Sequence, residues 1–317
     1  MKKLIAWVLT GTMALSVAGC STSGSDLAAL DKDTIITAGE YEISAAQAKV
    51  FLLNNTNIYG NGYGIDITEQ SDDDTFDTYV KDATFSLLKR TAALCSIANE
   101  QGETITSSQQ EEAEKLAGEY YASLSENEIE YTGITEDEVE KLYEYYILGN
   151  QIYNDIKSTV SEDVSADDAK VIKVYQIFVE DEDSVKSVEK DLKKGEKFIN
   201  VALEYSEASE VSVEVDKYDI PTEAVEKVFA LEEDERTDAI QTSDGYYFYY
   251  CVDNSMKAET KENKSEIYQE RVEEAVDEKC DSVYSQETYS EDLEKWEKIS
   301  VPKGEGISSD TFFELAV

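Results

Sequence analysis

The stretch from Val171 to Ser206, VIKVYQIFVEDEDSVKSVEKDLKKGEKFINVALEYS, constrains the fold more than any other part of the chain. It opens with an apolar run rich in β-branched and aromatic residues, which predicts a buried strand. A charged segment of helical character follows and ends at Gly195, a residue type that commonly stands just past a helix C-terminus. A second helix is expected to begin at Glu196. The stretch therefore predicts the first half of a small α+β module.

The residues after Ser206 predict the second half of this module. Val211, Val213 and Val215 alternate as in a strand, and residues 222–229 indicate a short helix. A second strong strand is expected from Tyr246 to Val252, after a turn at residues 243–245. The expected order is β-α-α-β-α-β, within a module spanning residues 169–256.

Residues 21–168 predict a mostly helical N-terminal domain that includes a tether. A hairpin around Gly39 is expected first, with Ser44 as the N-cap of the next helix. Apolar residues then recur at helical spacing in the segments 45–58, 75–99, 107–124 and 135–160. Each helix is apolar on one side only, so the helices must pack against one another. The glycine-rich segment 59–64 has no lysine after it and no βαβ context, and a plain loop is expected there.

Residues 257–317 form the last region. The pattern indicates helix from Met256 to Trp296, with Ile267, Val272, Val276, Cys280 and Val283 spread along a highly charged surface. Such a helix is too polar to be stable alone, so it needs a partner surface. We expect it to return to the N-terminal helices. The whole chain is thus expected to be α+β, with a small module inserted into a helical domain.

The charge balance excludes two classes of ligand. With 70 acidic and 28 basic residues the chain has a net charge of −42, which repels nucleic acid and anionic lipid head groups. A solvated, aggregation-resistant surface is one interpretation, and binding of basic clients or cations is the other. Histidine is absent, which removes the commonest general base and the commonest metal ligand. Neither a cofactor nor a metal is expected.

The first 20 residues resemble a bacterial lipoprotein signal. Lys2 and Lys3 precede an apolar run, and small residues lead to Cys20. The resemblance implies cleavage before Cys20, lipid on its thiol, and a location at the outer face of the bacterial cell membrane; an ordinary secretory peptide is the alternative. The other three cysteines form no CxxC motif, so free buried thiols are expected at the positions Cys95, Cys251 and Cys280.

The order of these regions resembles the extracytoplasmic foldase lipoproteins of the PrsA type, which are related to the SurA chaperones. In that family a helical N-terminal domain and a returning C-terminal helix form a chaperone lobe, and a parvulin prolyl-isomerase domain is inserted between them. The step Lys-Lys-Gly-x-x-Phe matches at residues 193–198, and Ala-x-x-Tyr-Ser matches at residues 202–206. Phe-x-Leu matches at Phe229 and Leu231, and Thr-x-x-Gly-Tyr matches at residues 242–246.

The chain departs from the family at the catalytic positions. Gln176 and Tyr247 stand where the resemblance implies two histidines, and Thr242 matches the family threonine. The Gly-Gly-Asp-Leu-Gly block is absent, with Asp216 as a tentative stand-in for its aspartate. The resemblance also suggests Ile220 and Phe229 as contacts for a substrate proline.

The missing histidines bear on mechanism. An amide and a phenol can each donate and accept a hydrogen bond, so Gln176 and Tyr247 could form a neutral pair, but neither titrates near neutral pH. Prolyl isomerisation breaks no covalent bond, and catalysis can come from desolvation and from binding the twisted amide. We expect isomerase activity to be low or absent.

Three functions follow as hypotheses. The first is a lipid-anchored chaperone or foldase that binds unfolded or partly folded exported polypeptides, with a degenerate parvulin domain. The second is an active peptidyl-prolyl isomerase. The third is a non-catalytic surface protein that uses its acidic face to bind a basic partner.

Overall fold

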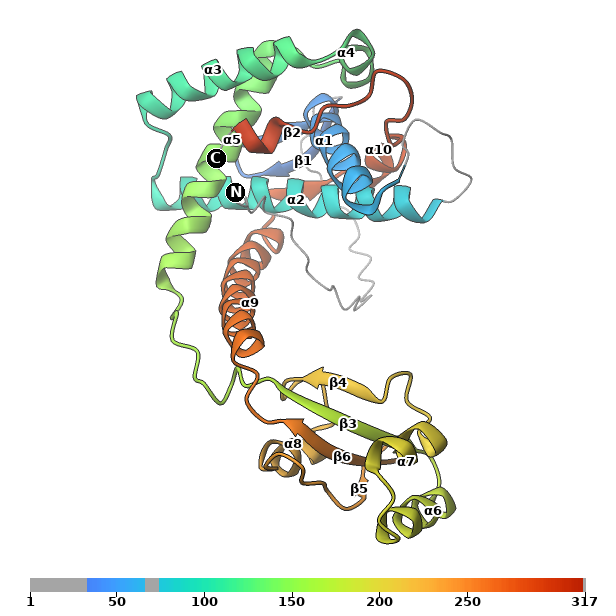
Figure 1. Cartoon of the computed structure of the whole chain (residues 1–317). Coiled ribbons are helices and arrows are strands. Elements are labelled where there is room, and N and C mark those ends of the chain that lie inside the picture. The colour runs from blue at the N-terminus through green and yellow to red at the C-terminus, as the bar shows by residue number, and fades with distance from the viewer. Residues whose placement is uncertain (1–32, 66–73, 316–317) are drawn as a thin grey trace. The chain divides into compact units, whose positions relative to one another are not determined.

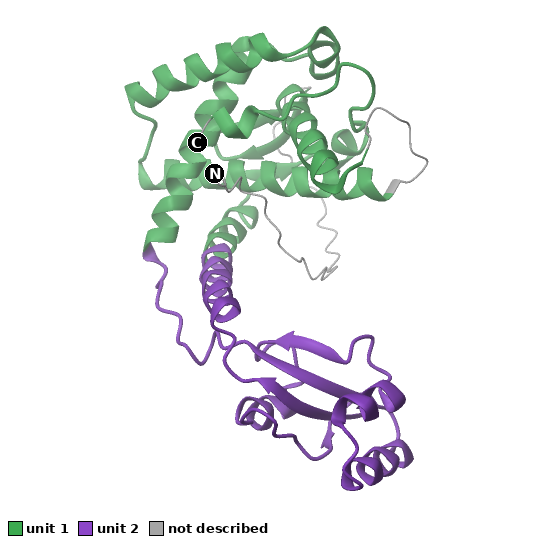
Figure 2. Cartoon of the chain, in the orientation of Figure 1, with its two compact units in different colours: residues 1–158, 275–317 green, residues 159–274 purple. Residues whose placement is uncertain are grey.

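The computed structural model describes residues 33–65 and 74–315, so the predicted signal segment and Cys20 lie outside the described residues. The described chain is α+β, as the sequence predicts (Figure 1). It divides into two compact units, unit 1 comprising residues 1–158 and 275–317 and unit 2 comprising residues 159–274 (Figure 2). Unit 1 is therefore built from both ends of the chain, and unit 2 from its middle.

Five helices come from the N-terminal part of unit 1. Their bounds are α1 (Ala45–Tyr63), α2 (Asp74–Gln101), α3 (Ser107–Ser123), α4 (Glu126–Thr132) and α5 (Glu136–Thr159). Capping boxes at Ser44, Thr106 and Ser125 start three of them, because each hydroxyl accepts from a backbone N–H three residues on. The predicted loop at 59–64 is wrong: α1 continues to Tyr63 and ends where Gly64 adopts a φ of 68°. Helix α4 was not predicted.

A three-stranded antiparallel sheet joins the two ends of the chain within unit 1. Strand β1 (Thr34–Ala38) lies between β2 (Tyr41–Ser44) and β7 (Tyr289–Glu291). The hairpin of β1 and β2 is the predicted one, whereas the predicted helix from Met256 to Trp296 is wrong over its last part. Helix α9 (Lys257–Tyr284) ends early, because residues 289–291 satisfy the second edge of β1 before α10 (Leu293–Glu297) begins.

The C-terminal tail completes the core of unit 1. Phe312, the first residue of α11 (Phe312–Leu315), is fully buried and stacks on Tyr143 with ring centroids 4.2 Å apart. Its ring also meets Phe51 and Tyr120, at 5.3 Å each. The backbone of Phe312 is bonded as well, since its N–H donates to Asn54 Oδ1 at 3.0 Å and its carbonyl accepts from Tyr143 Oη at 3.1 Å.

Glu128 holds the same tail to α4. The carboxylate is buried, and its Oε1 accepts from the backbone N–H groups of Ser308 and Ser309 at 2.8 Å each. Its Oε2 accepts from the N–H of Ser125 at 2.8 Å. Burial would raise the pKa of Glu128, but the backbone donors outweigh burial and hold the pKa below its ordinary value. A charged side chain thus becomes a bonded part of the interior.

Unit 2 contains a four-stranded antiparallel sheet in the order β4-β3-β6-β5. Its elements are β3 (Ile172–Val179), α6 (Glu182–Lys193), α7 (Phe198–Tyr205), β4 (Ser212–Val215), α8 (Thr222–Phe229), β5 (Ile240–Gln241) and β6 (Tyr246–Asp253). The predicted order of strands and helices is confirmed, with the two-residue β5 added at one edge. Because side chains alternate along a strand, the sheet has two distinct faces.

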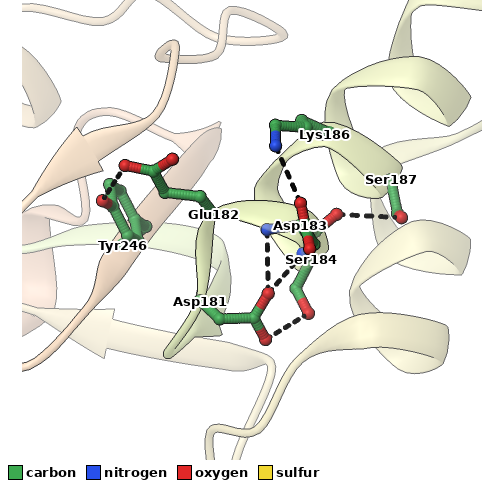
Figure 3. A network of polar contacts seen from close by, with 7 residues as sticks. All are labelled: Asp181, Glu182, Asp183, Ser184, Lys186, Ser187 and Tyr246. Carbon is green, nitrogen blue, oxygen red and sulfur yellow. Dashed lines mark hydrogen bonds and ion pairs between the residues drawn. The ribbon is translucent and has the colours of Figure 1, made fainter.

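Helices α6 and α7 cover one face of this sheet. Ile177 and Val179 of β3 and Phe248 of β6 point to this face and are fully buried with residues of both helices. Asp181 caps α6 by accepting from the N–H groups of Asp183 and Ser184 at 2.8 and 2.9 Å (Figure 3). Figure 3 also shows Glu182, in the first turn of α6, beside the hydroxyl of Tyr246 on β6. Helix α8 covers the opposite face.

Helix α9 is shared between the two units. The sequence placed a boundary at residue 257, the start of this helix, whereas the unit boundary falls after Glu274. The first turns of α9 pack on the segment before β3, where Ile267 lies in a small core with Val164 and Ala169. Its later turns belong to unit 1, as the 2.5 Å ion pair between Arg90 and Asp277 shows.

Candidate functional site

Gln176 and Tyr247 lie on the α8 face of the unit 2 sheet. In the antiparallel register Gln176 pairs with Tyr249, and Phe178 pairs with Tyr247. The two candidate side chains are therefore diagonal neighbours on one face. The ring of Tyr247 lies 4.8 Å from that of Phe178 and stacks on that of Tyr249 at 5.9 Å between centroids. The structure thus brings the two degenerate catalytic positions to the same surface.

Gln176 and Tyr247 do not bond to each other. Gln176 Nε2 donates to the carbonyl of Glu210 at 2.9 Å, and within the described residues no hydrogen bond joins Gln176 to Tyr247. Partial burial and the nearby carboxylate of Asp244 raise the pKa of Tyr247. A phenol with a raised pKa stays neutral at physiological pH, so neither side chain supplies a proton-transfer group there.

Thr242 serves the turn between β5 and β6. Its hydroxyl donates to the carbonyl of Gly245 at 3.1 Å and accepts from the N–H of Asp244 at 3.3 Å. Gly245 has a φ of 152°, and a Cβ there would lie 2.6 Å from the carbonyl oxygen of Val179. Thr242 and Gly245, both matched to the family motif, therefore have structural roles in this turn.

Ile220 and Phe229 pack into the core beneath α8. Ile220 is buried, and Phe229 packs against the same cluster at the end of the helix. The ammonium of Lys170 lies 5.9 Å from the centre of the Phe229 ring and donates to the Phe229 carbonyl at 3.3 Å. The structure brings Ile220, Phe229 and Tyr247 into one apolar cluster.

Asp216 lies apart from these residues. It follows Val215, which pairs with Ile172 at the opposite end of β3 from Phe178. Its Oδ1 accepts from the N–H of Tyr218 at 2.7 Å, and its Oδ2 accepts from Asn263 Nδ2 at 3.0 Å. The first contact closes the turn after β4, and the second ties this turn to α9. The structure therefore does not bring Asp216 together with Gln176 and Tyr247.

Tyr249 is the residue of this face that the sequence did not single out. It is fully buried in one cluster with Ala224 and Val228 of α8, and its hydroxyl has no hydrogen-bond partner among the described residues. Burial raises its pKa. The alternating pattern of YYFYYCV places it in a strand but does not reveal that its hydroxyl ends in an apolar core. The middle of this sheet face is thus occupied by the buried ring of Tyr249.

Two surface hollows lie away from this face. One is lined by residues of α4 and of the tail around Lys303, and the other by residues 166–170 together with the start of α9. Across residues 33–65 and 74–315, no group of three or more His, Cys, Asp or Glu side chains is arranged to hold a metal ion. The cysteines at positions 95, 251 and 280 are free and buried.

Within the same described ranges, no helix is both long and apolar enough to cross a membrane. No protein-family model and no curated protein matches the sequence.

Several solved structures are similar to the chain. A peptidylprolyl isomerase (PrsA) from Bacillus cereus is 20% identical, and the match covers 89% of this chain and 98% of that one with a TM-score of 0.41. The corresponding protein from Bacillus anthracis is 17% identical over 62% of this chain and 95% of that one, with a TM-score of 0.38. A SurA-like chaperone from Campylobacter jejuni is 9% identical. The match covers 82% of this chain and 98% of that one, with a TM-score of 0.29. PrsA-type and SurA-like proteins are also the group that the sequence resembles.

Proposed function

We propose that this protein is an extracytoplasmic chaperone or foldase that holds unfolded or partly folded exported polypeptides. The observation that carries the proposal is the construction of unit 1 from both ends of the chain. Strand β1 pairs with β7, and Phe312 fills the core between α1 and α5, so the α+β unit stands as an insertion in a helical unit. This is the architecture that the resemblance to PrsA-type foldases implies.

The inserted unit contributes little or no prolyl-isomerase activity in this proposal. Gln176 and Tyr247 form no hydrogen-bonded pair, and the ring of Tyr249 is buried on the same sheet face. Lowering the torsional barrier of about 20 kcal/mol requires a site that desolvates and binds the twisted amide. In this proposal the α8 face supplies no such site, because buried side chains of the α8 cluster pack against it, and the unit instead acts as a scaffold or client contact.

The location follows from the N-terminal sequence. Cleavage before Cys20 and lipidation of its thiol would anchor the protein at the outer face of the bacterial cell membrane, with the sequence STSGSD after Cys20 as the tether. Labelling with a radioactive or clickable fatty acid tests this step. The wild-type chain is expected to incorporate the lipid, and Cys20→Ala is expected to abolish incorporation and release the protein from the membrane.

The chaperone activity is tested by light scattering from a reduced, aggregating client. The chain from residue 21 onward is expected to suppress aggregation near equimolar ratio. An unrelated acidic protein of similar net charge is the matched control, since it separates client binding from charge repulsion. Absence of protection, together with salt-sensitive binding to basic proteins, would instead identify an acidic surface-binding protein.

Prolyl-isomerase activity is tested separately with a proline-containing peptide. We expect a rate that stays within about twofold of the uncatalysed rate at high protein concentration, because the site is covered. A clear acceleration would favour the active isomerase and would leave the chaperone test unaffected.

A further inference from the structure

The hollow at the start of α9 is an unusual site in so acidic a chain. Its volume is about 360 Å³, and nine residues line it: Ala166, Asp167, Lys170, Asn254, Ser255, Lys257, Thr260, Lys261 and Lys264. Four of these are lysines and one is an aspartate, whereas the chain as a whole has a net charge of −42. The hollow lies entirely within unit 2, because residues 159–274 supply its whole lining.

Three of these lysines share one side of α9. Lys257, Lys261 and Lys264 are spaced by four and three residues, which places them on one side of a helix. The neighbouring acids Glu259, Glu262 and Glu266 fall on the opposite side by the same geometry. The sequence KAETKENKSE thus separates its charges into a basic side facing the hollow and an acidic side facing away.

These three lysines also lack acidic partners. Other lysines of unit 2 form ion pairs: Lys186 lies 2.7 Å from Asp183, and Lys193 lies 2.7 Å from Glu189. Among the described residues, none of Lys257, Lys261 and Lys264 makes such a pair. Placing like charges together without counter-charges is unfavourable, and it is relieved when an anion binds between them.

The walls of the hollow are fixed before any ligand binds. The N–H of Val171 donates to Thr260 Oγ1 at 3.0 Å, and Asn263 Nδ2 donates to the carbonyl of Ala169 at 3.2 Å. Ile267 of α9 packs on Val164 and Ala169 beneath these bonds. The segment before β3 is therefore clamped to the first turns of α9. A rigid wall reduces the ordering that a ligand must impose on binding.

We propose that this hollow binds a small phosphate-bearing anion. Lysine ammonium groups are compact charges with three donors each, and phosphate presents several charged acceptor oxygens to such a group. The hydroxyls of Ser255 and Thr260 and the amide of Asn254 add neutral polar groups to the same lining. A membrane of anionic lipids is the poorer ligand, because the site is concave and the remaining surface of the chain repels such a membrane. The site is independent of the proposed chaperone function.

The test is calorimetric titration of the full-length chain with inorganic pyrophosphate in metal-free buffer. Saturable binding at one site is expected, weakening as sodium chloride is raised. The triple variant K257Q/K261Q/K264Q is expected to bind at least about tenfold more weakly, since charge-assisted hydrogen bonds are lost. Unchanged binding by this variant, or no saturable binding by the wild type, would overturn the proposal.

Two controls keep the result interpretable. The variant K186Q/K193Q/K298Q removes the same charge from three lysines that each pair with an acid, and it is expected to bind pyrophosphate like the wild type. Equal unfolding temperatures for the two triple variants show that the fold is kept. Sedimentation with phosphatidylglycerol vesicles separates the sources of phosphate: lysine-dependent vesicle binding without pyrophosphate binding would assign the site to a lipid surface and contradict the proposal.

Discussion

The buried tyrosines around Phe312 in unit 1 and Tyr249 in unit 2 differ in how their hydroxyls are bonded. In unit 1, Tyr120 Oη accepts from Asn54 Nδ2 at 2.6 Å and Tyr143 Oη donates to the Phe312 carbonyl at 3.1 Å. In unit 2, the hydroxyl of Tyr249 is equally buried and has no partner among the described residues. An unbonded buried hydroxyl destabilises a fold, whereas a bonded one specifies its packing.

The difference shows how these two aromatic clusters are held together. The aromatic core of unit 1 ties residues from both ends of the chain together through rings and hydrogen bonds. On the α8 face of unit 2, Tyr249 is buried in an apolar cluster, and Gln176 bonds to the carbonyl of Glu210 and not to Tyr247. The contrast agrees with the proposed function, in which the inserted unit has little or no isomerase activity.

The largest expected effect is at the unit 1 core. Phe312→Ala removes a fully buried ring that contacts five other aromatic side chains, and we expect the free energy of unfolding to fall by about 3–5 kcal/mol. Urea denaturation followed by tyrosine fluorescence measures the change. Leu203→Ala is the control, because Leu203 is 70% exposed and its truncation is expected to change stability by less than about 0.5 kcal/mol. A loss below about 1 kcal/mol for Phe312→Ala would show that the tail does not complete the core.

The next effect concerns Glu128 and depends on pH. Glu128→Gln places an amide NH₂ against one of three backbone N–H donors, and we expect a loss of about 1.5–3 kcal/mol at pH 7. Because the folded-state pKa is lowered, this stabilisation is present above the unfolded pKa and is lost as pH falls through the folded pKa. The difference between wild type and variant should therefore shrink below about pH 4. Glu130→Gln, at an exposed position of the same helix, is expected to leave the free energy of unfolding unchanged at all these pH values. If the stability difference between wild type and Glu128→Gln stayed constant down to low pH, the role of the ionised carboxylate would be refuted.

The smallest effect distinguishes the two kinds of buried tyrosine by its sign. Tyr249→Phe removes an unbonded hydroxyl and is expected to raise stability by about 1 kcal/mol, whereas Tyr120→Phe removes a bonded one and is expected to lower stability by about 1 kcal/mol. Parallel thermal and urea denaturation of both variants measures the two signs. A loss for Tyr249→Phe equal to that for Tyr120→Phe would mean that the Tyr249 hydroxyl has a polar partner in solution.

Much of the fold could be predicted from the sequence because local signals agreed with the final packing. The strands β3 and β6 are dense in β-branched and aromatic residues, and Ser44 caps α1 as expected. Strand β7 could not be found this way, since Tyr289–Glu291 has little strand character of its own and forms only because β1 offers an unpaired edge. The end of α1 was missed because the glycine-rich segment 59–64 was predicted to be a plain loop, although of its glycines only Gly64 adopts a positive φ.

The candidate site was predictable in part. The family motif placed Gln176 and Tyr247 on adjacent strands, and strand register brings them to one face. Gln176 bonds instead to the carbonyl of Glu210, which lies after α7 in a segment whose path no local sequence pattern predicts. The sequence therefore could not show that Gln176 and Tyr247 form no mutual hydrogen bond. Asp216 was assigned by sequence order alone, and the register of β4 carries it to the other end of β3. The basic hollow was missed because Lys170 is far from α9 in sequence.

One refolding measurement tests the central claim most directly. A client whose last folding step is limited by prolyl isomerisation is refolded in the presence of the chain, and both the yield and the rate constant of the slow phase are recorded. We predict a higher yield with an unchanged slow phase, because the helical unit holds the client while the inserted unit does not catalyse. Acceleration of the slow phase without a gain in yield would contradict this account.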